Sequence, residues 1–332
     1  MKDYPKISII IPSYNQGKYI ERTLLSILRQ NYNGGKEIIV SDGGSTDQTV
    51  DILKRYNIIW WSEKDKGFSD AVNKGLKIAT GEIVAIQSSD DYYLQGTFQK
   101  AVKYLTKFPE LGFVSGNDIA IDINNRILRV MLKRQIIDTP LYFLRHGYIP
   151  QHATFIRRKA IDRIGGLKIT CDQCGDADLF YRILHFYDGL MVRDLFSVYQ
   201  VHQAQRTQND PHLWIASLER MINECKEDPN YSRIFNVSPK IYNEFIIYEK
   251  LLWEHRSGNK EKAISQLEEV MASNMDDSSD WFKYSLQGLN KQVHSAKTSI
   301  YDKLFEGKLL NKIYTKLRLY SIKLCYDLNW YR

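Results

Sequence analysis

Short apolar runs alternate with apolar residues at helical spacing through the first part of the chain. The runs lie at 7–11, 37–41, 57–61 and 82–87, and each predicts a buried strand. The intervening segments predict amphipathic helices, through Ile20, Leu24, Ile27 and Leu28, through Val50 and Leu53, and through Ala71, Val72, Leu76 and Ala79. Strands that alternate with helices predict βαβ crossovers and a mostly parallel sheet covered on both faces, so the expected fold class is α/β.

The pattern becomes mixed beyond residue 111 and purely helical near the end. It predicts strands near Phe113, at 153–157 and at 190–198, and helices at 158–164 and 176–187. After Gln205 the strand signals stop, and amphipathic helices follow, with polar breaks at 257–259 and 276–280. We therefore expect an α/β domain over residues 1–205 and a helical C-terminal region over 206–332.

Composition narrows the class of protein. With 332 residues, 43% hydrophobic and 26% charged, the chain is neither disordered, collagen-like nor wholly embedded in a membrane. No stretch approaches the ~20 apolar residues of a membrane span, and the start lacks the apolar core of a signal peptide. Four cysteines are too few for a disulfide scaffold and favour a reducing compartment, so we expect a cytoplasmic protein.

A positive charge excess favours an anionic partner. The net charge is +7 and the pI is near 9.0. In residues 309–332, leucines and tyrosines share one side of a predicted helix and lysines lie on another, a pattern that can dock on an anionic membrane surface. The same pattern also suits a helix packed on the α/β domain. No DNA- or RNA-reading motif occurs, so nucleic acid is not an expected partner.

Polar and acidic residues follow the four predicted strands. They are Pro12-Ser13-Tyr14-Asn15, the DGGSTD segment at 42–47, Ser62-Glu63-Lys64-Asp65 and Ser89-Asp90-Asp91. The carboxyl ends of parallel strands meet at one edge of a sheet, where ligands bind. Acidic clusters converging there would repel one another without a cation, and a hard divalent cation shared with substrate phosphates would compensate them.

Two plainer interpretations apply to single segments. Ser45 and Gln48 fit a capping box for the next helix, and Asp90-Asp91 could begin the helix that follows. Neither explains why every strand end is polar. The conjunction favours a ligand site.

These segments together resemble the family 2 glycosyltransferases, inverting enzymes of the GT-A fold that use nucleotide sugars. The resemblance covers roughly residues 6–202 and lies in the segments 12–30, 37–53, 62–91, 149–167 (IPQHATFIRRKAIDRIGGL) and 175–184 (GDADLFYRIL). A dinucleotide-binding enzyme would instead need G-x-G-x-x-G after the first strand, which is absent. The resemblance implies a GT-A domain with an α-helical C-terminal extension.

The resemblance assigns donor-binding roles. It implies that Pro12, Tyr14 and Asp42 hold the nucleotide base, with uracil favoured because Asp42 can accept its N–H. It places Asp65 near the ribose or base, although Asp65 could instead pair with Lys64 or Lys66.

The family's metal motif corresponds to Ser89-Asp90-Asp91. The resemblance gives Asp91 the cation, Mn²⁺ or Mg²⁺, and Asp90 the ribose or donor sugar. His202 resembles a histidine that reaches the metal or diphosphate, and packing is its alternative. The segment with Asp70, Asn73 and Lys74 would reach the donor, with a solvated helix face as the alternative.

An inverting transfer needs a general base, which the family carries in a Glu-Asp pair. The resemblance assigns this role to Asp176, with Gly175 in place of the glutamate. Asp178 is the alternative, but it lies four residues before Arg182, which favours a helical ion pair.

Four further residues carry weaker signals. His152 and Arg157 either line the acceptor side or belong to an ordinary strand, and Cys171 and Cys174 have C-x-x-C spacing without a second pair of zinc ligands.

The function expected is transfer of a sugar from a UDP-sugar to a hydroxyl of a saccharide or lipid-linked saccharide. Cell-surface polysaccharide synthesis, in the cytoplasm and at the inner face of the membrane, is the expected setting. One alternative is a sugar-nucleotide pyrophosphorylase, whose glycine- and basic-rich loop after the first strand is missing. Another is a non-catalytic, membrane-associated sugar-binding module.

Overall fold

The fold is known from a computed structural model. It describes residues 4–133, 135–137, 149–203 and 205, short stretches between 216 and 224, residues 239–256 and 260–273, and short stretches between 278 and 290. The chain divides into two compact units, Met1–Asn236 and Val237–Arg332. The predicted boundary at residue 205 lies inside the first unit and stays a prediction.

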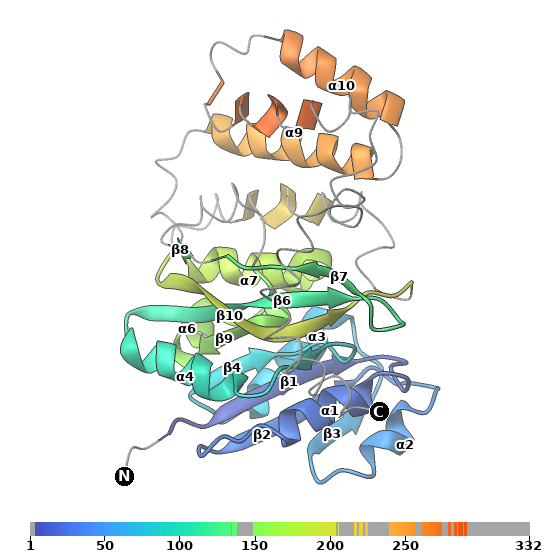
Figure 1. Cartoon of the computed structure of the whole chain (residues 1–332), viewed down its shortest axis with the longest axis vertical. Helices are drawn as coiled ribbons and strands as arrows, with labels where there is room; N and C mark the ends of the chain where they lie inside the picture. Colours follow the sequence, from blue (N-terminus) through green and yellow to red (C-terminus); the bar gives the residue numbers. More distant parts are fainter. Residues whose placement is uncertain are drawn as a thin grey trace. The chain divides into compact units, whose positions relative to one another are not determined.

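One mixed, curled sheet organises the first unit (Figure 1). Its strands are β1 (Ile7–Ser13), β2 (Lys36–Asp42), β3 (Ile59–Ser62), β4 (Ile83–Ile86), β5 (Tyr92–Tyr93), β6 (Leu111–Ile121), β7 (Ile127–Val130), β8 (Gln135–Ile137), β9 (Thr154–Arg157) and β10 (Asp188–Gln200). The order is β3-β2-β1-β4-β9-β6-β10-β5, with β7 beside β6 and β8 beside β10.

The first four strands are parallel, as the alternating pattern predicts. Ser13 pairs with Asp42, and Asp42 pairs with Ser62, so three strands end at one edge of the sheet. Beyond β4 the pairing is mixed, because β9 runs antiparallel to both β4 and β6 while β6 and β10 are parallel. The sheet therefore places β6 and β9 close to the end of β4.

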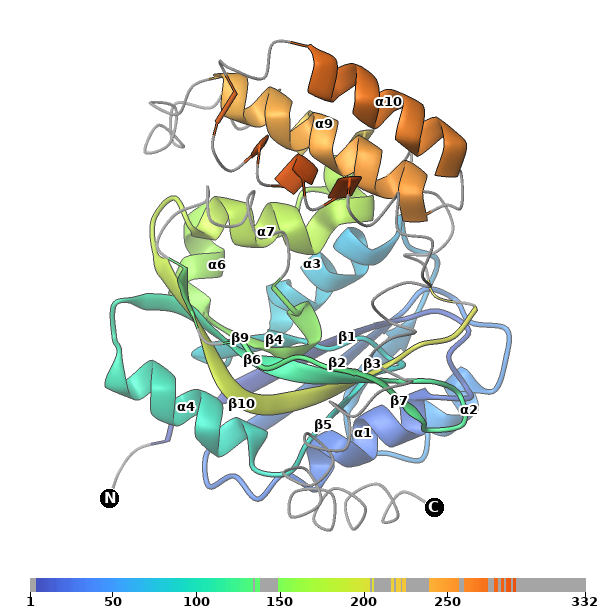
Figure 2. The same ribbon diagram turned by 45° about the horizontal axis from the view of Figure 1, so that its top comes forward.

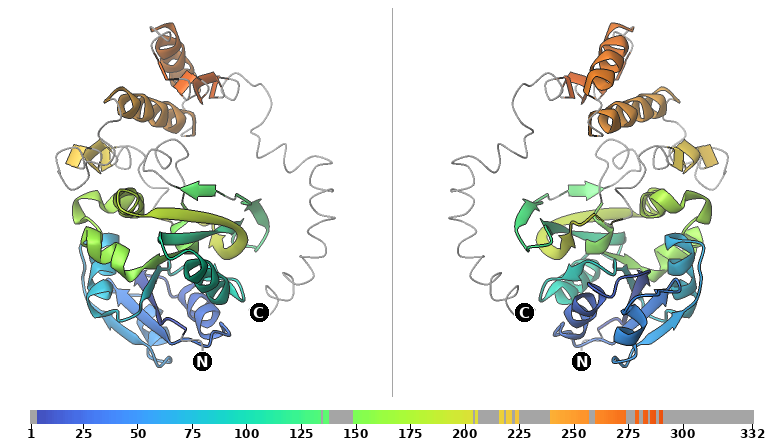
Figure 3. Two further views of the ribbon diagram at one scale, coloured as in Figure 1. Left: turned by 90° about the vertical axis from the view of Figure 1, so that its left-hand side faces the viewer. Right: turned by 90° about the vertical axis from the view of Figure 1, so that its right-hand side faces the viewer.

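Helices cover both faces of the sheet. They are α1 (Ile20–Leu28), α2 (Thr49–Leu53), α3 (Phe68–Ile78), α4 (Thr97–Lys107), α6 (Arg158–Ile164) and α7 (Gly175–Ile183), with 3₁₀ turns η1 (Gln151–Ala153) and η2 (Ile169–Cys174). Figures 2 and 3 show α1 and α4 on one face and α3, α6 and α7 on the other. The helices predicted in this part of the chain are confirmed in type and place.

Alternation along β1 explains both layers. Ile7, Ile9 and Ile11 belong to the core that contains the apolar residues of α1 and α4. Ile10 faces the other way, toward α3, where a Cβ on Gly75 would lie 2.6 Å from its Cγ2 atom. Glycine at that position permits the close approach of helix and strand.

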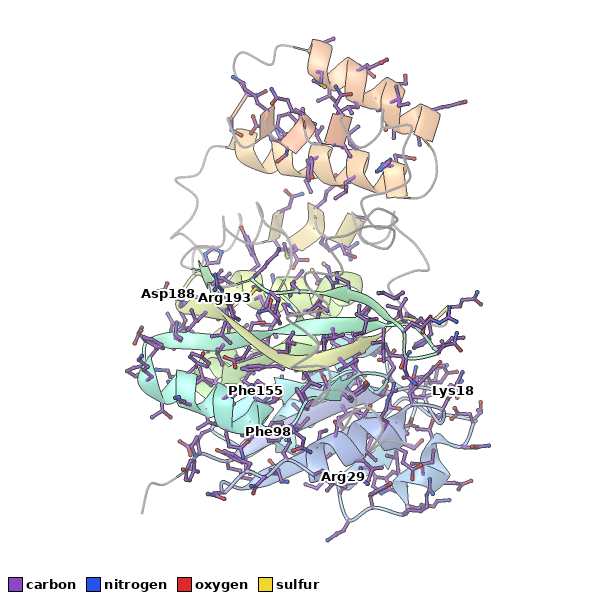
Figure 4. All side chains as sticks on the ribbon, viewed as in Figure 1. Lys18, Arg29, Phe98, Phe155, Asp188 and Arg193 are labelled. Carbon is purple, nitrogen blue, oxygen red and sulfur yellow. The ribbon has the colours of Figure 1, made fainter. Side chains whose placement is uncertain are left out.

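Aromatic rings fill the α4 side of the core. Phe98 of α4 and Phe155 of β9 lie with ring centroids 5.5 Å apart in an edge-to-face arrangement (Figure 4). Such pairs add about 0.5–1.5 kcal/mol beyond the area they bury. The rings link β9 to the helix layer and so help to hold β9 against β4.

The second unit contains α9 (Pro239–Arg256) and α10 (Lys260–Ala272), separated at the predicted polar break. A small apolar core joins their residues, among them Leu251 and Leu267, to Phe282, Leu286 and Leu289. Residues 309–332, with their predicted amphipathic helix, lie outside the described residues. Among the helices that the structure describes, none is long and apolar enough to cross a membrane.

Candidate active site

The loops after β1 and β2 lock together through side chains of the DGGSTD segment. Ser45 accepts the backbone N–H of Asn15 at 2.7 Å, and Asn15 Oδ1 accepts the backbone N–H of Thr46 at 2.9 Å. Asp47 accepts the N–H groups of Gly17 and Thr49, each at 2.9 Å. The capping-box interpretation of Ser45 is wrong, because its hydroxyl bonds within this loop pair and α2 begins only at Thr49.

Asp42 is buried at the centre of these loops. Its Oδ1 accepts the Ser45 hydroxyl at 2.5 Å, and its Oδ2 accepts the Ser45 N–H at 2.8 Å and the Ser62 hydroxyl at 2.6 Å. Three donors hold the carboxylate in one orientation. A carboxylate has about four lone-pair sites, so one remains for a ligand.

Tyr14, Pro12 and Asp65 surround the same strand ends. Tyr14 is 59% exposed, whereas Pro12 and Asp65 are half-buried. Asp65 Oδ1 accepts the Gly67 N–H at 2.9 Å, and a Cβ on Gly43 would lie 2.8 Å from Asp65 Oδ2. The glycine therefore lets the two loops approach, and the predicted base-binding residues lie on joined strand ends.

A polar stripe on α1 holds the Ser89-Asp90-Asp91 segment. Thr23 donates its hydroxyl to the carbonyl groups of Ser89 and Asp91, at 2.9 and 2.6 Å. One turn later, the Ser26 hydroxyl accepts the Tyr93 N–H at 3.1 Å. Gln30, two residues past the end of α1, donates its Nε2 to the Leu94 carbonyl at 2.8 Å. Sequence reasoning missed this stripe, although polar residues at helical spacing on a buried helix face were its signal.

The Asp91 carboxylate is buried with one oxygen free. Its Oδ1 accepts the Gln200 N–H at 2.9 Å, while its Oδ2 has no hydrogen-bond partner among the described residues. Burial and then the neighbouring Asp90 carboxylate raise the pKa of Asp91 to about 8. An orphaned, buried carboxylate oxygen next to a second carboxylate fits a cation ligand.

Asp90 and His202 face each other. His202 Nε2 lies 2.9 Å from Asp90 Oδ2, and its ring stacks on Tyr19 with centroids 4.5 Å apart. The structure thus brings His202 to Asp90, the residue that precedes Asp91. Within the described ranges no cluster of three His, Cys, Asp or Glu side chains could hold a metal by itself. A cation here would depend on ligands from the substrate.

His152 lies between two buried carboxylates. Its Nδ1 is 3.7 Å from Asp91 Oδ2 and its Nε2 is 3.2 Å from Asp118 Oδ2, while Arg129 Nη2 binds Asp118 Oδ1 at 2.9 Å. Burial alone would lower the pKa of His152, but the two carboxylates together raise it. Sequence reasoning missed Asp118 and Arg129; the signal for Asp118 was an acidic residue just before the apolar run Ile119-Ala120-Ile121.

Arg157 lies at the other end of β9. It pairs with Ile83 at the start of β4, and its Nε donates to the Leu111 carbonyl at 2.9 Å. Its Nη2 also bonds the carbonyl groups of Leu105 and Phe108. The structure therefore favours the ordinary strand interpretation for Arg157.

The two candidate bases, Asp176 and Asp178, both lie in the first turn of α7 but differ in burial and in hydrogen-bond partners. Asp176 is half-buried, and its Oδ1 accepts the Ala177 N–H at 2.8 Å. Asp178 is buried and accepts Arg182 Nε at 2.9 Å, the ion pair that the sequence spacing favours. A Cβ on Gly175 would lie 2.7 Å from the Ser69 hydroxyl oxygen, so α7 begins where only a small residue fits.

Asp70 and Lys74 belong to one charged cluster on α3. Lys74 Nζ lies 2.8 Å from Glu63 and 3.4 Å from Asp70. The hydrogen bond that Lys74 donates to Glu63, more than any other contact, raises the pKa of Lys74, and the Lys66 N–H is the main group that lowers the pKa of Asp70. Asn73 instead bonds the backbone of Leu167 in both directions, at 2.7 and 2.9 Å, and so holds the turn before η2.

Cys171 and Cys174 are free and buried. Burial and the shared thiol hydrogen bond suit two packed thiols at the start of α7 better than a metal site.

Comparison with known proteins shows that the chain is similar to glycosyltransferases. The family described as glycosyl transferase family 2 matches residues 8–165. An uncharacterized glycosyltransferase of Mycobacterium tuberculosis strain H37Rv is 25% identical over 263 residues, which is 77% of this chain and 97% of that protein. A PGL/p-HBAD biosynthesis glycosyltransferase of Mycobacterium bovis BCG is 30% identical over 154 residues, covering 42% of this chain and 60% of that protein.

Two solved structures share the fold. Residues 1–349 of Staphylococcus aureus TarS, in complex with UDP-GlcNAc, match with a TM-score of 0.61 and 15% identity, over 87% of this chain and 90% of that chain. The mannosyltransferase PcManGT of Pyrobaculum calidifontis, in complex with GDP-Man and Mn²⁺, matches with a TM-score of 0.53 and 19% identity, over 98% and 85%. At these identities the likeness shows the fold alone.

Proposed function

Because the chain belongs to the family 2 glycosyltransferases and has their GT-A fold, we propose that it is an inverting hexosyltransferase using a UDP-sugar. The acceptor is a hydroxyl of a saccharide or lipid-linked saccharide in cell-surface polysaccharide synthesis. The relative named for PGL/p-HBAD biosynthesis supports a glycosyltransferase that serves a biosynthetic route. The reaction takes place in the cytoplasm, at the inner face of the membrane.

The observation that carries this proposal is the free, buried Oδ2 of Asp91. It lies where the family's metal motif falls, one residue after Asp90, which pairs with His202. Asp91 would hold Mn²⁺ or Mg²⁺ together with the donor diphosphate. When bound, the cation supplies positive charge to the departing nucleotide. Asp90 and His202 would then contact the ribose, donor sugar or diphosphate.

The nucleotide binds over the ends of β1 to β3. The single free lone-pair site of Asp42 accepts the uracil N–H, and the exposed ring of Tyr14 offers a stacking surface beside Pro12. Asp65 lies across Gly43 from Asp42 and contacts the ribose or base. Because Asp42 is held by three donors, little rotamer entropy is lost when the base binds.

Asp176 acts as the general base. Arg182 pairs with Asp178, and the half-buried Asp176 carboxylate takes the proton from the attacking acceptor hydroxyl. Asp70 and Lys74 approach the donor from α3. Since Glu63 already neutralises Lys74, a phosphate must compete for that ammonium group.

Binding of the donor and of the cation tests the proposal. We expect UDP-sugars, screened by thermal shift, to stabilise the protein only when Mn²⁺ is present. By reciprocity, UDP and Mn²⁺ should raise each other's affinity by the same factor. Asp91→Asn should abolish this coupling, because a neutral amide is a poor ligand for a hard cation.

Other outcomes favour other functions. UDP affinity unchanged by EDTA would remove the cation from the mechanism. Binding of sugars without any donor hydrolysis in the wild type would indicate the non-catalytic module. Release of pyrophosphate from a nucleoside triphosphate and a sugar phosphate would indicate the pyrophosphorylase.

A further inference from the structure

A buried histidine links Asp91 to two charged residues that the proposed reaction does not use. Arg129 of β7 binds Asp118 of β6, Asp118 Oδ2 lies 3.2 Å from His152 Nε2, and His152 Nδ1 lies 3.7 Å from Asp91 Oδ2. Asp118 and Asp91 are at most 1% exposed, and the His152 side chain is 6% exposed. Four side chains from separate segments of the chain thus form one continuous contact.

The His152 ring has little freedom to turn. Tyr199 stacks on it with a centroid distance of 5.3 Å and an interplanar angle of 18°. Asp118 holds the Nε2 edge, and Arg129 keeps Asp118 in place through both carboxylate oxygens, at 2.9 and 3.2 Å. With its face and one edge fixed, the ring must direct its Nδ1 edge at Asp91.

The Asp91 carboxylate is consequently held on two sides. The Gln200 N–H fixes Oδ1, and the His152 ring lies against Oδ2. A separation of 3.7 Å is longer than a hydrogen bond, so Oδ2 keeps its lone pairs while the ring opposes rotation of the carboxylate. Groups behind metal ligands commonly fix their orientation in this way.

We propose that His152 is a positioning residue, which, backed by Asp118 and Arg129, orients Asp91 Oδ2 toward the cation shared with the donor diphosphate. This inference rests on the proposed function, because it needs Asp91 to be the cation ligand.

Two amide substitutions test which edge of the ring matters. Glutamine places its amide group near the former Nε2 position, facing Asp118, and asparagine places its amide near Nδ1, facing Asp91. The measured quantity is the ratio of UDP dissociation constants without and with Mn²⁺, determined by calorimetry on the full chain. We expect His152→Gln to reduce this ratio by about 10–100-fold, the usual effect of losing a group behind a metal ligand. His152→Asn should retain more of the ratio, and UDP affinity in EDTA should change little in both.

His185→Gln is the matched control. His185 is also buried, and it contacts Tyr181 with ring centroids 5.1 Å apart. We expect this variant to lower the melting temperature without changing the Mn²⁺ ratio. Equal reductions of the ratio in His152→Gln and His185→Gln would overturn the inference. It would also be overturned if His152→Asn reduced the ratio as much as His152→Gln does.

Arg129→Gln extends the test if His152→Gln does not fold. The Arg129 side chain is 34% exposed, so its loss is less disruptive, and it should reduce the ratio in the same direction through Asp118. An unchanged ratio in Arg129→Gln would also count against the inference. A wild-type protein without any Mn²⁺ dependence would overturn the proposed function as well, whereas a wild-type ratio that survives in His152→Gln overturns only the role of His152.

Discussion

Asp176 and Asp178 lie two residues apart, yet the fold surrounds their carboxylates differently. Asp178 is fully buried against Arg182, which also donates to the Ile164 and Gly166 carbonyl groups at 2.6 Å. Asp176 is half-buried at the start of the same helix. The Asp178–Arg182 arrangement suits a structural ion pair, and the greater exposure of Asp176 suits a carboxylate that meets substrate.

We therefore expect Asp176→Asn to keep UDP binding and to lose transfer by about 10²–10⁴-fold, the usual effect of removing a general base. Asp178→Asn is the comparison. It should lower the free energy of unfolding by about 3–5 kcal/mol, because Arg182 loses its buried partner. Rate measurements and denaturant unfolding on both variants separate the roles, and normal transfer in Asp176→Asn would move the base elsewhere.

The Glu37 carboxylate makes the free energy of unfolding depend on pH in the acid range. Glu37 accepts the Ser8 hydroxyl at 2.6 Å, the Thr80 N–H at 2.9 Å and Lys6 Nζ at 3.1 Å. Burial raises the pKa of Glu37, but these donors outweigh burial and lower it below the ordinary 4.5. A lowered folded-state pKa stabilises the protein above the unfolded value, and this contribution is lost as the pH falls through the folded value.

Glu37→Gln should consequently remove part of the acid sensitivity. We expect its free energy of unfolding, measured from pH 7 down to pH about 3, to fall less steeply below pH about 4.5 than that of the wild type. Glu110→Gln, at an exposed glutamate, is the control and should follow the wild type. Parallel curves for Glu37→Gln and the wild type would contradict the assignment.

At the scale of elements, α1 positions the acidic loop through its polar stripe. Thr23 is fully buried and serves two carbonyl acceptors, those of Ser89 and Asp91. Helix α1 and the acidic segment 89–91 after β4 are therefore coupled, so a substitution on α1 should change the affinity for the donor.

Thr23→Val preserves the shape of the side chain and removes the hydroxyl that donates the two hydrogen bonds. Buried carbonyl groups left without a partner cost about 1–3 kcal/mol, so we expect that loss in the free energy of unfolding. UDP affinity in the presence of Mn²⁺ should fall as well. Thr106→Val on the exposed side of α4 should stay within about 0.5 kcal/mol of the wild type. A Thr23→Val variant as stable as that control would show that the stripe does not hold the loop.

At the scale of the whole molecule, the basic C-terminal segment 309–332 has a pattern that suits either a membrane surface or packing on the α/β domain. If residues 309–332 dock on anionic lipid, each lysine should contribute on the order of 1 kcal/mol, and salt should weaken the attachment. Deleting 309–332 should then release the protein from anionic vesicles while transfer to a soluble acceptor continues.

Vesicle flotation and a melting curve on the same truncation distinguish the two interpretations of this segment. A segment that packs on the α/β domain would lower the melting temperature when deleted, because apolar surface would become exposed. A truncated protein that floats as well as the full chain would exclude membrane docking through 309–332.

Local pattern was enough to predict strands β1 to β4, β6, β9 and β10, helices α1 to α3, α6 and α7, and the residues at the strand ends. It did not predict helix α4 or the short strands β5, β7 and β8. Periodicity follows from which faces are buried, and each of the predicted elements buries one face or two, so its signal lies within a few neighbouring residues. The acidic segment 89–91, the loop at 42–47 and the Asp178–Arg182 pair were all visible in this way.

Only the tertiary structure could reveal the residues behind the site. Asp118 and His152 meet Asp91 because β9 inserts between β4 and β6 in the sheet, an order that depends on pairings between distant segments. The same holds for Thr23, whose acceptors lie 66 and 68 positions along the chain. Arg157 shows the converse, since the antiparallel direction of β9 carries it away from the end where His152 lies. Local sequence sets which face of an element is buried, but the free energy of long-range packing decides which buried faces meet.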